Sequence, residues 1–219
     1  MASSLRIHAC DLLQAQDAVR ALLHTILFHR LFGQVVPKQL DILDVPVPAV
    51  DDPHVEALVD ERAAAYVKAL RAAHTQATSA ASHSNSHVAR GSMPVLAIEF
   101  YEKRTRKGWF LGRAEEQVCW DSWQIAIDSL TSPSRPGDAQ RRALAQTIEQ
   151  CMMQVIQTVN ERNDAYIPPI PYNEGNNANP FPYVIEVRSA GQQGESVGLG
   201  LEGAPSAAAA QAEGEGWFR

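Results

Sequence analysis

The chain has 219 residues, of which 45% are hydrophobic and 20% are charged, as in an ordinary globular protein. This length fits one large domain or two small ones, with a core that needs neither disulfides nor a metal to fold. The net charge of −6 argues against a nucleic-acid-binding protein with a basic face. The three cysteines (Cys10, Cys119 and Cys151) are widely spaced without a C-x-x-C motif. They predict neither a disulfide framework nor a zinc site, and they indicate a reducing compartment.

No stretch of the sequence approaches the ~18–20 consecutive apolar residues that a membrane span requires. The first residues lack the continuous apolar core and small-residue cleavage site of a secretory signal. We therefore expect a soluble protein of the cytoplasm.

The first half of the chain predicts a strand, a helix, a hairpin and a second helix. Alternating apolar residues at 5–9 predict a short strand, and Asp11 is a candidate N-cap for a helix that ends near Phe32 and Gly33. One apolar stripe runs along this helix: Leu12, Ala15, Val19, Leu22, Leu23, Ile26 and Leu27. Four prolines within residues 34–53 permit short edge strands or a hairpin. A second amphipathic helix starts near Asp51 or Asp52 and reaches residue 73.

The second half predicts a polar loop, two strands, a third helix and a last strand. Residues 74–87 are rich in Ser, Ala and His and are typical of a solvated loop. Strands are predicted at 95–101 and 120–127, and the long loop between them is of the kind that is usually functional. A third helix starts at residues 132–134 and stops before Pro168, and a strand follows at 181–187. This order predicts one α/β, or more strictly α+β, sandwich with helices against a mainly antiparallel sheet, followed by a flexible Gly/Ala-rich tail at 189–219.

No group of residues builds a catalytic or metal site. His24 and His29 are five residues apart on a helix, whereas helical metal pairs are three or four apart. His83 and His87 lie in a Ser/Asn-rich segment without a nearby cysteine or carboxylate cluster. Cys119 would act as a nucleophile only if a histidine approached it, and its neighbour Trp120 favours a packed thiol. We expect no enzymatic activity, no metal and no cofactor.

One segment differs from the rest of the acidic chain. Residues 102–113 carry five basic side chains and one acidic side chain, and Trp109 and Phe110 lie among them between Gly108 and Gly112. Two interpretations are open. Both rings fold back into the core, as most aromatic residues do. Alternatively, they project as a hydrophobic finger that docks into a partner, because aromatic anchors dominate binding hot spots.

Several blocks resemble the autophagy-related protein 101 family. They are residues 22–30 with Gly33, residues 98–101 leading through the basic run to Trp109 and Phe110, residues 120–123, and residues 166–171. The blocks occur in the family's order and extend over roughly residues 5–188.

The resemblance implies a HORMA domain at residues 1–188, with three helices on an antiparallel sheet. It also implies a non-catalytic adaptor subunit of the autophagy-initiation kinase complex, located in the cytoplasm and at the phagophore assembly site. Members of the family bind and stabilise the HORMA domain of autophagy-related protein 13. They recruit downstream autophagy factors through a Trp-Phe pair called the WF finger, which falls on Trp109 and Phe110 here.

Two other functions remain open on the residues. The first is a checkpoint-type HORMA adaptor whose C-terminal segment closes over a peptide, although the tail has few β-branched residues from Ala204 onward. The second is a peripheral membrane protein that uses the basic aromatic segment. A single loop of this charge gives weak adsorption, at about 1 kcal/mol per basic residue near an anionic surface.

Overall fold

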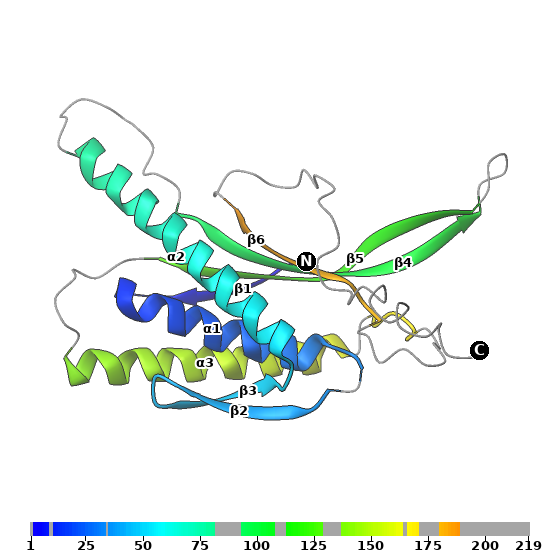
Figure 1. Ribbon diagram of the computed structural model, residues 1–219, viewed down its shortest axis with the longest axis horizontal. Helices are drawn as coiled ribbons and strands as arrows, with labels where there is room; N and C mark the ends of the chain where they lie inside the picture. The colour runs from blue at the N-terminus through cyan, green and yellow to red at the C-terminus, as the bar shows by residue number, and fades with distance from the viewer. Residues whose placement is uncertain are drawn as a thin grey trace, which may run out of the picture.

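A four-stranded sheet forms one layer of the molecule (Figure 1). The computed structural model describes residues 2–8, 11–33, 35–81, 93–107, 113–128, 137–163, 166–170 and 180–188. The strands of this sheet are β1 (Ser3–Ile7), β4 (Val95–Lys107), β5 (Arg113–Ile127) and β6 (Tyr183–Arg188). Their spatial order is β1-β5-β4-β6. The β5–β4 and β4–β6 pairs are antiparallel and β1 lies parallel to β5, so the sheet is mixed but mostly antiparallel.

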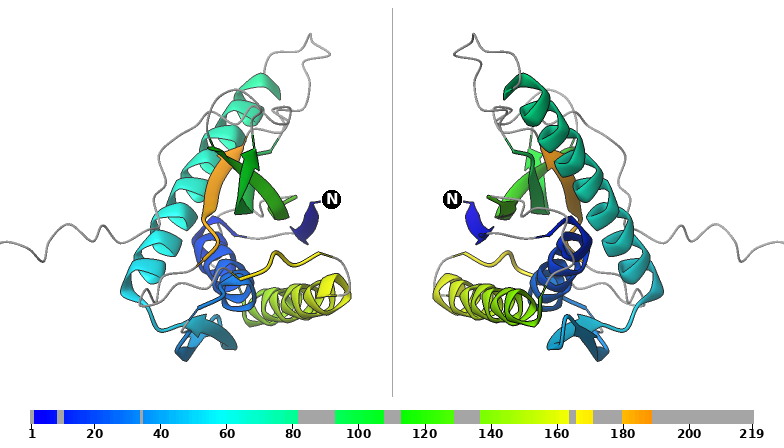
Figure 2. Two further views of the ribbon diagram at one scale, coloured as in Figure 1. Left: turned by 90° about the vertical axis from the view of Figure 1, so that its right-hand side faces the viewer. Right: turned by 90° about the vertical axis from the view of Figure 1, so that its left-hand side faces the viewer.

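Three helices and a hairpin form the rest of the described structure. The helices are α1 (Leu12–Arg30), α2 (Pro53–Ala81) and α3 (Asp138–Asn163), and the hairpin pairs β2 (Pro37–Ile42) with β3 (Val45–Val50). Figure 2 shows α1 at the centre of the molecule, with the sheet above it, α2 and α3 on either side and the hairpin below. Because α1 has neighbours on all sides, its apolar stripe is the middle of the core.

Local chemistry explains where the elements begin. The backbone carbonyl of Asp11 accepts a hydrogen bond from the N–H of Ala15 at 2.8 Å, which makes Asp11 the N-cap of α1. Asp52 has the same role for α2: its Oδ1 accepts from the N–H of His54 at 2.8 Å, and Pro53 takes the first helical position. The hairpin turns at Leu43 and Asp44, whose φ angles are 53° and 63°.

The α1 stripe fills the core together with the inward residues of the sheet. Leu22, Leu23 and Ile26 are fully buried, and so are Trp123, Ile125 and Ile127 of β5, which face the helices. The alternation predicted for β5 and the periodicity predicted for α1 are both confirmed. The observed order of elements and the α+β arrangement are those expected of a HORMA domain.

Several boundaries differ from the prediction. Helix α2 continues to Ala81, so the loop predicted from His74 was wrong over residues 74–81, where alanines and glutamine sustain the helix beyond the core. The two central strands reach Lys107 and Arg113, so the long loop predicted between them was also wrong. Helix α3 begins at Asp138. Residues 189–219, predicted as a flexible tail, lie outside the described residues.

Candidate functional site

The two central strands extend well beyond their neighbours in the sheet. Strand β6 pairs with β4 only as far as Phe100, and β1 pairs with β5 only from Trp123 onward. Residues 101–107 of β4 and 113–120 of β5 therefore form a two-stranded ribbon, which we call the arm; it projects from the domain at the right of Figure 1. Within the described residues no further strand pairs with either edge of the arm, although the backbone N–H of its first residue, Tyr101, donates to the carbonyl of Pro182 at 2.8 Å.

A β-bulge lies where the four-stranded sheet becomes the arm. Phe100 is opposite Asp121, whereas the next residue of β4, Tyr101, is opposite Cys119, so Trp120 is the extra residue on β5. A bulge of this kind bends the strand and increases its twist. The direction of the arm therefore changes at Trp120.

A buried ion pair lies beside the bulge. Nε of Arg30, the last residue of α1, is 2.7 Å from Oδ2 of Asp121, and the two side chains are 1% and 3% exposed. The same carboxylate accepts hydrogen bonds from the indole N–H of Trp123 at 2.8 Å and from the backbone N–H of Ser122 at 2.9 Å. These contacts join the end of α1 to the base of the arm.

Aromatic rings pack around this pair. The Arg30 guanidinium lies over the Trp120 ring at 5.5 Å from its centroid, in cation–π contact. The Trp120 ring also lies 5.5 Å from Phe181 and 6.0 Å from both Phe32 and Phe100, measured between centroids. The bulge residue is thus held by α1, by β4 and by the segment that precedes β6.

A second polar cluster holds the arm on its other strand. Glu102 is buried although it is charged, and its Oε2 accepts a hydrogen bond from the Tyr166 hydroxyl at 2.9 Å. Arg104 forms an ion pair with Glu102, and its guanidinium lies 5.5 Å from the Tyr166 ring centroid. Hydrogen bonding to Tyr166 and to Glu102 raises the pKa of Arg104 further above its ordinary value, at which an arginine is already charged throughout the physiological pH range.

Further contacts fix β4 to the edge strand β6. The two terminal guanidinium nitrogens of Arg188, Nη1 and Nη2, donate to the Glu99 carboxylate at 2.8 Å, and the Tyr101 hydroxyl donates to it at 2.7 Å. Hydrogen bonds from Arg188 lower the pKa of Glu99, whereas desolvation and the neighbouring carboxylate raise that of Tyr101. Glu99 is therefore a stable carboxylate at neutral pH, and the cluster has no group poised to exchange a proton there.

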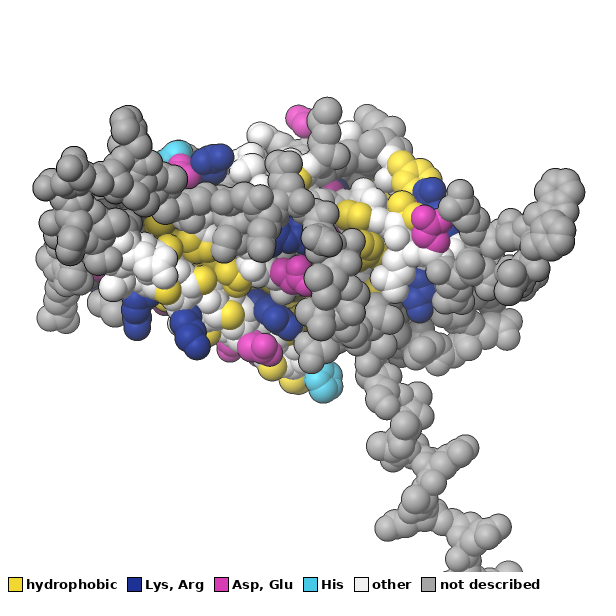
Figure 3. Space-filling view, turned by 90° about the horizontal axis from the view of Figure 1, so that it is seen from above, with side chains coloured by type: hydrophobic (Ala, Val, Ile, Leu, Met, Phe, Trp, Pro, Cys, Tyr) yellow, Lys and Arg dark blue, Asp and Glu magenta, His cyan; other side chains and the backbone are white. Residues whose placement is uncertain are grey.

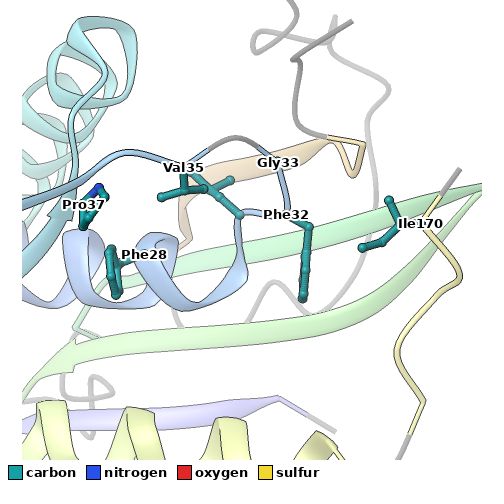
Figure 4. A pocket seen from close by; sticks show the side chains of 7 residues that line it. Phe28, Phe32, Gly33, Val35, Pro37 and Ile170 are labelled. Atoms are coloured by element: carbon teal, nitrogen blue, oxygen red, sulfur yellow. The ribbon is translucent and has the colours of Figure 1, made fainter. Parts of the chain in front are cut away.

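An apolar hollow of about 420 Å³ opens near the C-terminal end of α1 (Figure 4). Its walls come from α1, from the segment before β2 and from residue 170: Phe28, Leu31, Phe32, Gly33, Val35, Pro37 and Ile170. The side chain of Ile170 points into the hollow from the side opposite to α1. Ile170 is 60% exposed. Such a lining offers apolar contact and no acid, base or metal ligand.

Among the described residues, the histidines and cysteines that the sequence singled out do not assemble a reactive site. His24 is 1% exposed, and neither of its ring nitrogens has a hydrogen-bond partner in the described structure. Burial lowers the pKa of both His24 and His29. Burial, with Glu99 and Asp121 nearby, raises the pKa of the Cys119 thiol, which disfavours the nucleophilic thiolate. His83 and His87 lie outside the described residues.

Charge on the described surface is mixed. On the face seen in Figure 3, basic and acidic side chains lie among one another. Within the described ranges, no three His, Cys, Asp or Glu side chains are grouped so that they could hold a metal ion. None of the described helices is both long and apolar enough to cross a membrane.

The predicted finger residues, Trp109 and Phe110, lie outside the described residues, between the two ends of the arm at Lys107 and Arg113. The ion pair at the base of the arm was missed by the sequence analysis. A charged residue in each of two apolar elements, Arg30 after the α1 stripe and Asp121 within the β5 alternation, was the available signal. The pairing itself is a tertiary contact that no local pattern contains.

Comparison with known proteins assigns the family. The family model described as Autophagy-related protein 101 matches residues 8–174. A relative named Autophagy-related protein 101 from Schizosaccharomyces pombe is 29% identical over 171 residues, which cover 78% of each chain. One of the same name from Arabidopsis thaliana is 26% identical over 194 residues, covering 78% of this chain and 80% of its own. The chain therefore belongs to the autophagy-related protein 101 family, which gives it a role in autophagy.

Proposed function

We propose that the chain is a non-catalytic adaptor subunit of the autophagy-initiation kinase complex. In this proposal it binds and stabilises the HORMA domain of autophagy-related protein 13, and it recruits downstream autophagy factors through Trp109 and Phe110. It acts in the cytoplasm and at the phagophore assembly site. The family supports the pathway, and the resemblance of the sequence blocks supports the partner and the finger.

The arm is the observation that carries the recruiting role. Beyond Phe100 on β4 and before Trp123 on β5, its two strands no longer pair with β6 and β1. The five residues that connect Lys107 to Arg113 contain two large aromatic rings. The last strand positions before this connection carry basic residues, which are costly to bury without partners. An aromatic pair that enters a partner pocket contributes about 2 kcal/mol or more as a hot spot.

The recruiting role is tested with the double variant Trp109→Ala, Phe110→Ala. Its melting temperature should be nearly unchanged, and it should still bind the partner HORMA domain, but recruitment of later autophagy factors to starvation-induced puncta should be lost. Leu111→Ala is the matched control, because it truncates a large apolar side chain in the same segment and leaves both rings in place. A double variant that melts several degrees lower, or that recruits normally, contradicts the finger assignment.

The pairing role is tested separately. The chain and the HORMA domain of an autophagy-related protein 13 orthologue, co-expressed and analysed by size exclusion with light scattering, should elute as a one-to-one complex. Two monomer peaks at micromolar concentration would contradict it. Flotation of the chain with anionic liposomes distinguishes the adaptor from a peripheral membrane protein, since the adaptor should stay at the bottom of the gradient.

A further inference from the structure

The arm is a ribbon whose direction has to be set at its base. Two antiparallel strands without further neighbours are marginally stable in water. Beyond the Phe100–Tyr183 and Trp123–Ser3 pairs, the described part of the arm gains no strand on either edge. Whatever holds the ribbon at one angle to the domain must therefore act at the bulge or just beyond it.

A charged group, the guanidinium of Arg30, joins the bulge to the C-terminal end of α1. Arg30 reaches the carboxylate of Asp121 with Nε at 2.7 Å and covers the ring of Trp120 with its guanidinium plane. It thus contacts two consecutive residues of β5 at the point where the register shifts. Charge-assisted hydrogen bonds and stacked guanidinium groups are strongly directional, and the burial of both partners removes the water that would otherwise compete with them.

We propose that the Arg30–Asp121 pair is a positioning device that fixes the angle at which the arm leaves the sheet. The proposal rests on the proposed function in one respect: what the arm presents at its end is Trp109 and Phe110. A buried ion pair is weak evidence for stability, because an apolar replacement of both partners is often neutral or stabilising. Its place beside a bulge at the base of a projecting ribbon points instead to a role in orientation.

The proposal is tested with variants in which the effect on stability and the effect on the angle of the arm differ. Asp121→Asn keeps the shape of the side chain and leaves the buried Arg30 charge without its counter-ion, so this variant should melt at a lower temperature. The double variant Arg30→Met, Asp121→Asn removes both charges and should recover most of the lost stability. It lacks the directional contact, so the angle of the arm should not be recovered.

The angle is measured on the full-length, 15N-labelled chain in weakly aligned solution. In the wild type, residual dipolar couplings of arm amides (residues 101–106 and 115–119) should fit the alignment tensor determined from α3 and the core of the sheet. In the double variant the arm couplings should shrink and no longer fit this tensor, although those of α3 still do. Arg30→Lys, a milder change that keeps the charge and loses the planar stack, should give an intermediate deviation.

A matched control pair lies elsewhere on α1. Arg20 joins α1 to Asp60 of α2 at 2.5 Å, at a more exposed position. Arg20→Met with Asp60→Asn should leave the arm couplings on the common tensor. If the folded Arg30→Met, Asp121→Asn variant, or Arg30→Lys, also keeps its arm couplings on that tensor, the pair is structural and the proposal is overturned.

The experiment is independent of the proposed function. It uses the chain alone, so its outcome does not depend on any partner or on the aromatic rings. If the Trp109→Ala, Phe110→Ala variant recruits later autophagy factors normally, the finger assignment is refuted, and the dipolar-coupling result for the Arg30–Asp121 pair is unaffected. A rigid arm in the charge-free variant would refute the positioning role and leave the finger intact.

Discussion

Tyr66 joins α2 to the residue before β4 and to the end of β5 through a single hydroxyl, and removal of this hydroxyl provides a sharp test of the packing. The side chain is fully buried, its hydroxyl donates to the carbonyl of Pro94 at 3.1 Å, and it accepts from the N–H of Ile127 at 3.1 Å. Tyr66→Phe removes the oxygen and keeps the ring, so it opens no cavity larger than one atom. Two backbone groups then lose a partner in a place that water does not reach.

The expected loss of stability follows from the two backbone groups that lose a partner, the carbonyl of Pro94 and the N–H of Ile127. An unsatisfied buried donor or acceptor costs about 1–3 kcal/mol, and the N–H of Ile127 is the more costly of the two because a carbonyl tolerates an unfilled lone pair more easily. We therefore expect the free energy of unfolding to fall by about 1–3 kcal/mol. In a domain of this size each kcal/mol lowers the melting temperature by about 2–4 °C.

The assay is urea unfolding monitored by tryptophan fluorescence, with thermal melts alongside it. The midpoint should fall while the slope with urea stays constant, because the surface exposed on unfolding is unchanged. Thr75→Ala, which removes an exposed hydroxyl bonded within the same helix at 2.9 Å, is the control and should change stability by less than about 0.5 kcal/mol. A Tyr66→Phe variant as stable as that control would refute the bridge between α2 and the sheet.

Other predictions concern the core, the buried histidine and the tail. Leu23→Ala, at a fully buried position of α1, should destabilise by about 2–5 kcal/mol through loss of burial and cavity formation, and an unchanged melting temperature would contradict the packing. The folded-state pKa of His24 lies below its ordinary value of 6.5 through burial and then Arg20, with Lys38 acting in the same direction and Glu56 and Asp60 against it. The contribution of neutral His24 to the free energy of unfolding should therefore be fully present above about pH 6.5. It should be lost as the pH falls below that value, because the unfolded chain binds the proton more readily than the folded one. His24→Leu should flatten this fall in pH-dependent melts. We also propose that truncation after Arg188 leaves the fold and partner binding intact, and protection of amides in residues 189–219 from hydrogen exchange would contradict this.

Periodic burial explains what could be predicted from the sequence. Leu22, Leu23 and Ile26 repeat at helical spacing because one face of α1 meets the core, and Trp123, Ile125 and Ile127 alternate for the same reason in a strand. The arm escaped prediction because its sequence shows no alternation of apolar and polar side chains, which is the pattern that identifies a half-buried strand. The last turns of α2 escaped it because residues 74–81 have no periodic stripe of large apolar side chains in the sequence.

The polar contacts at the base of the arm could not be predicted without the tertiary structure. Arg30 and Asp121 each stand out as a charged residue in an apolar element, but no local pattern pairs them, and only the fold brings Nε and Oδ2 within 2.7 Å of one another. Glu102 likewise stands in a segment of mixed charge and is buried by Tyr166, a residue far along the chain. Long-range polar contacts of this kind leave no periodic trace.

The two unpaired edges of the arm have a consequence for the solubility of the chain. A free strand edge is a template on which a second chain adds its own strand, so long edges promote aggregation unless they carry charge. Lys103 and Arg104 on β4 and Glu116 and Gln117 on β5 are exposed along the described part of these edges. Mixed charge here disfavours edge-to-edge stacking of two copies, in which like charges of identical strands would meet. The polar character of the arm thus protects the free monomer at the place where the sheet is least covered.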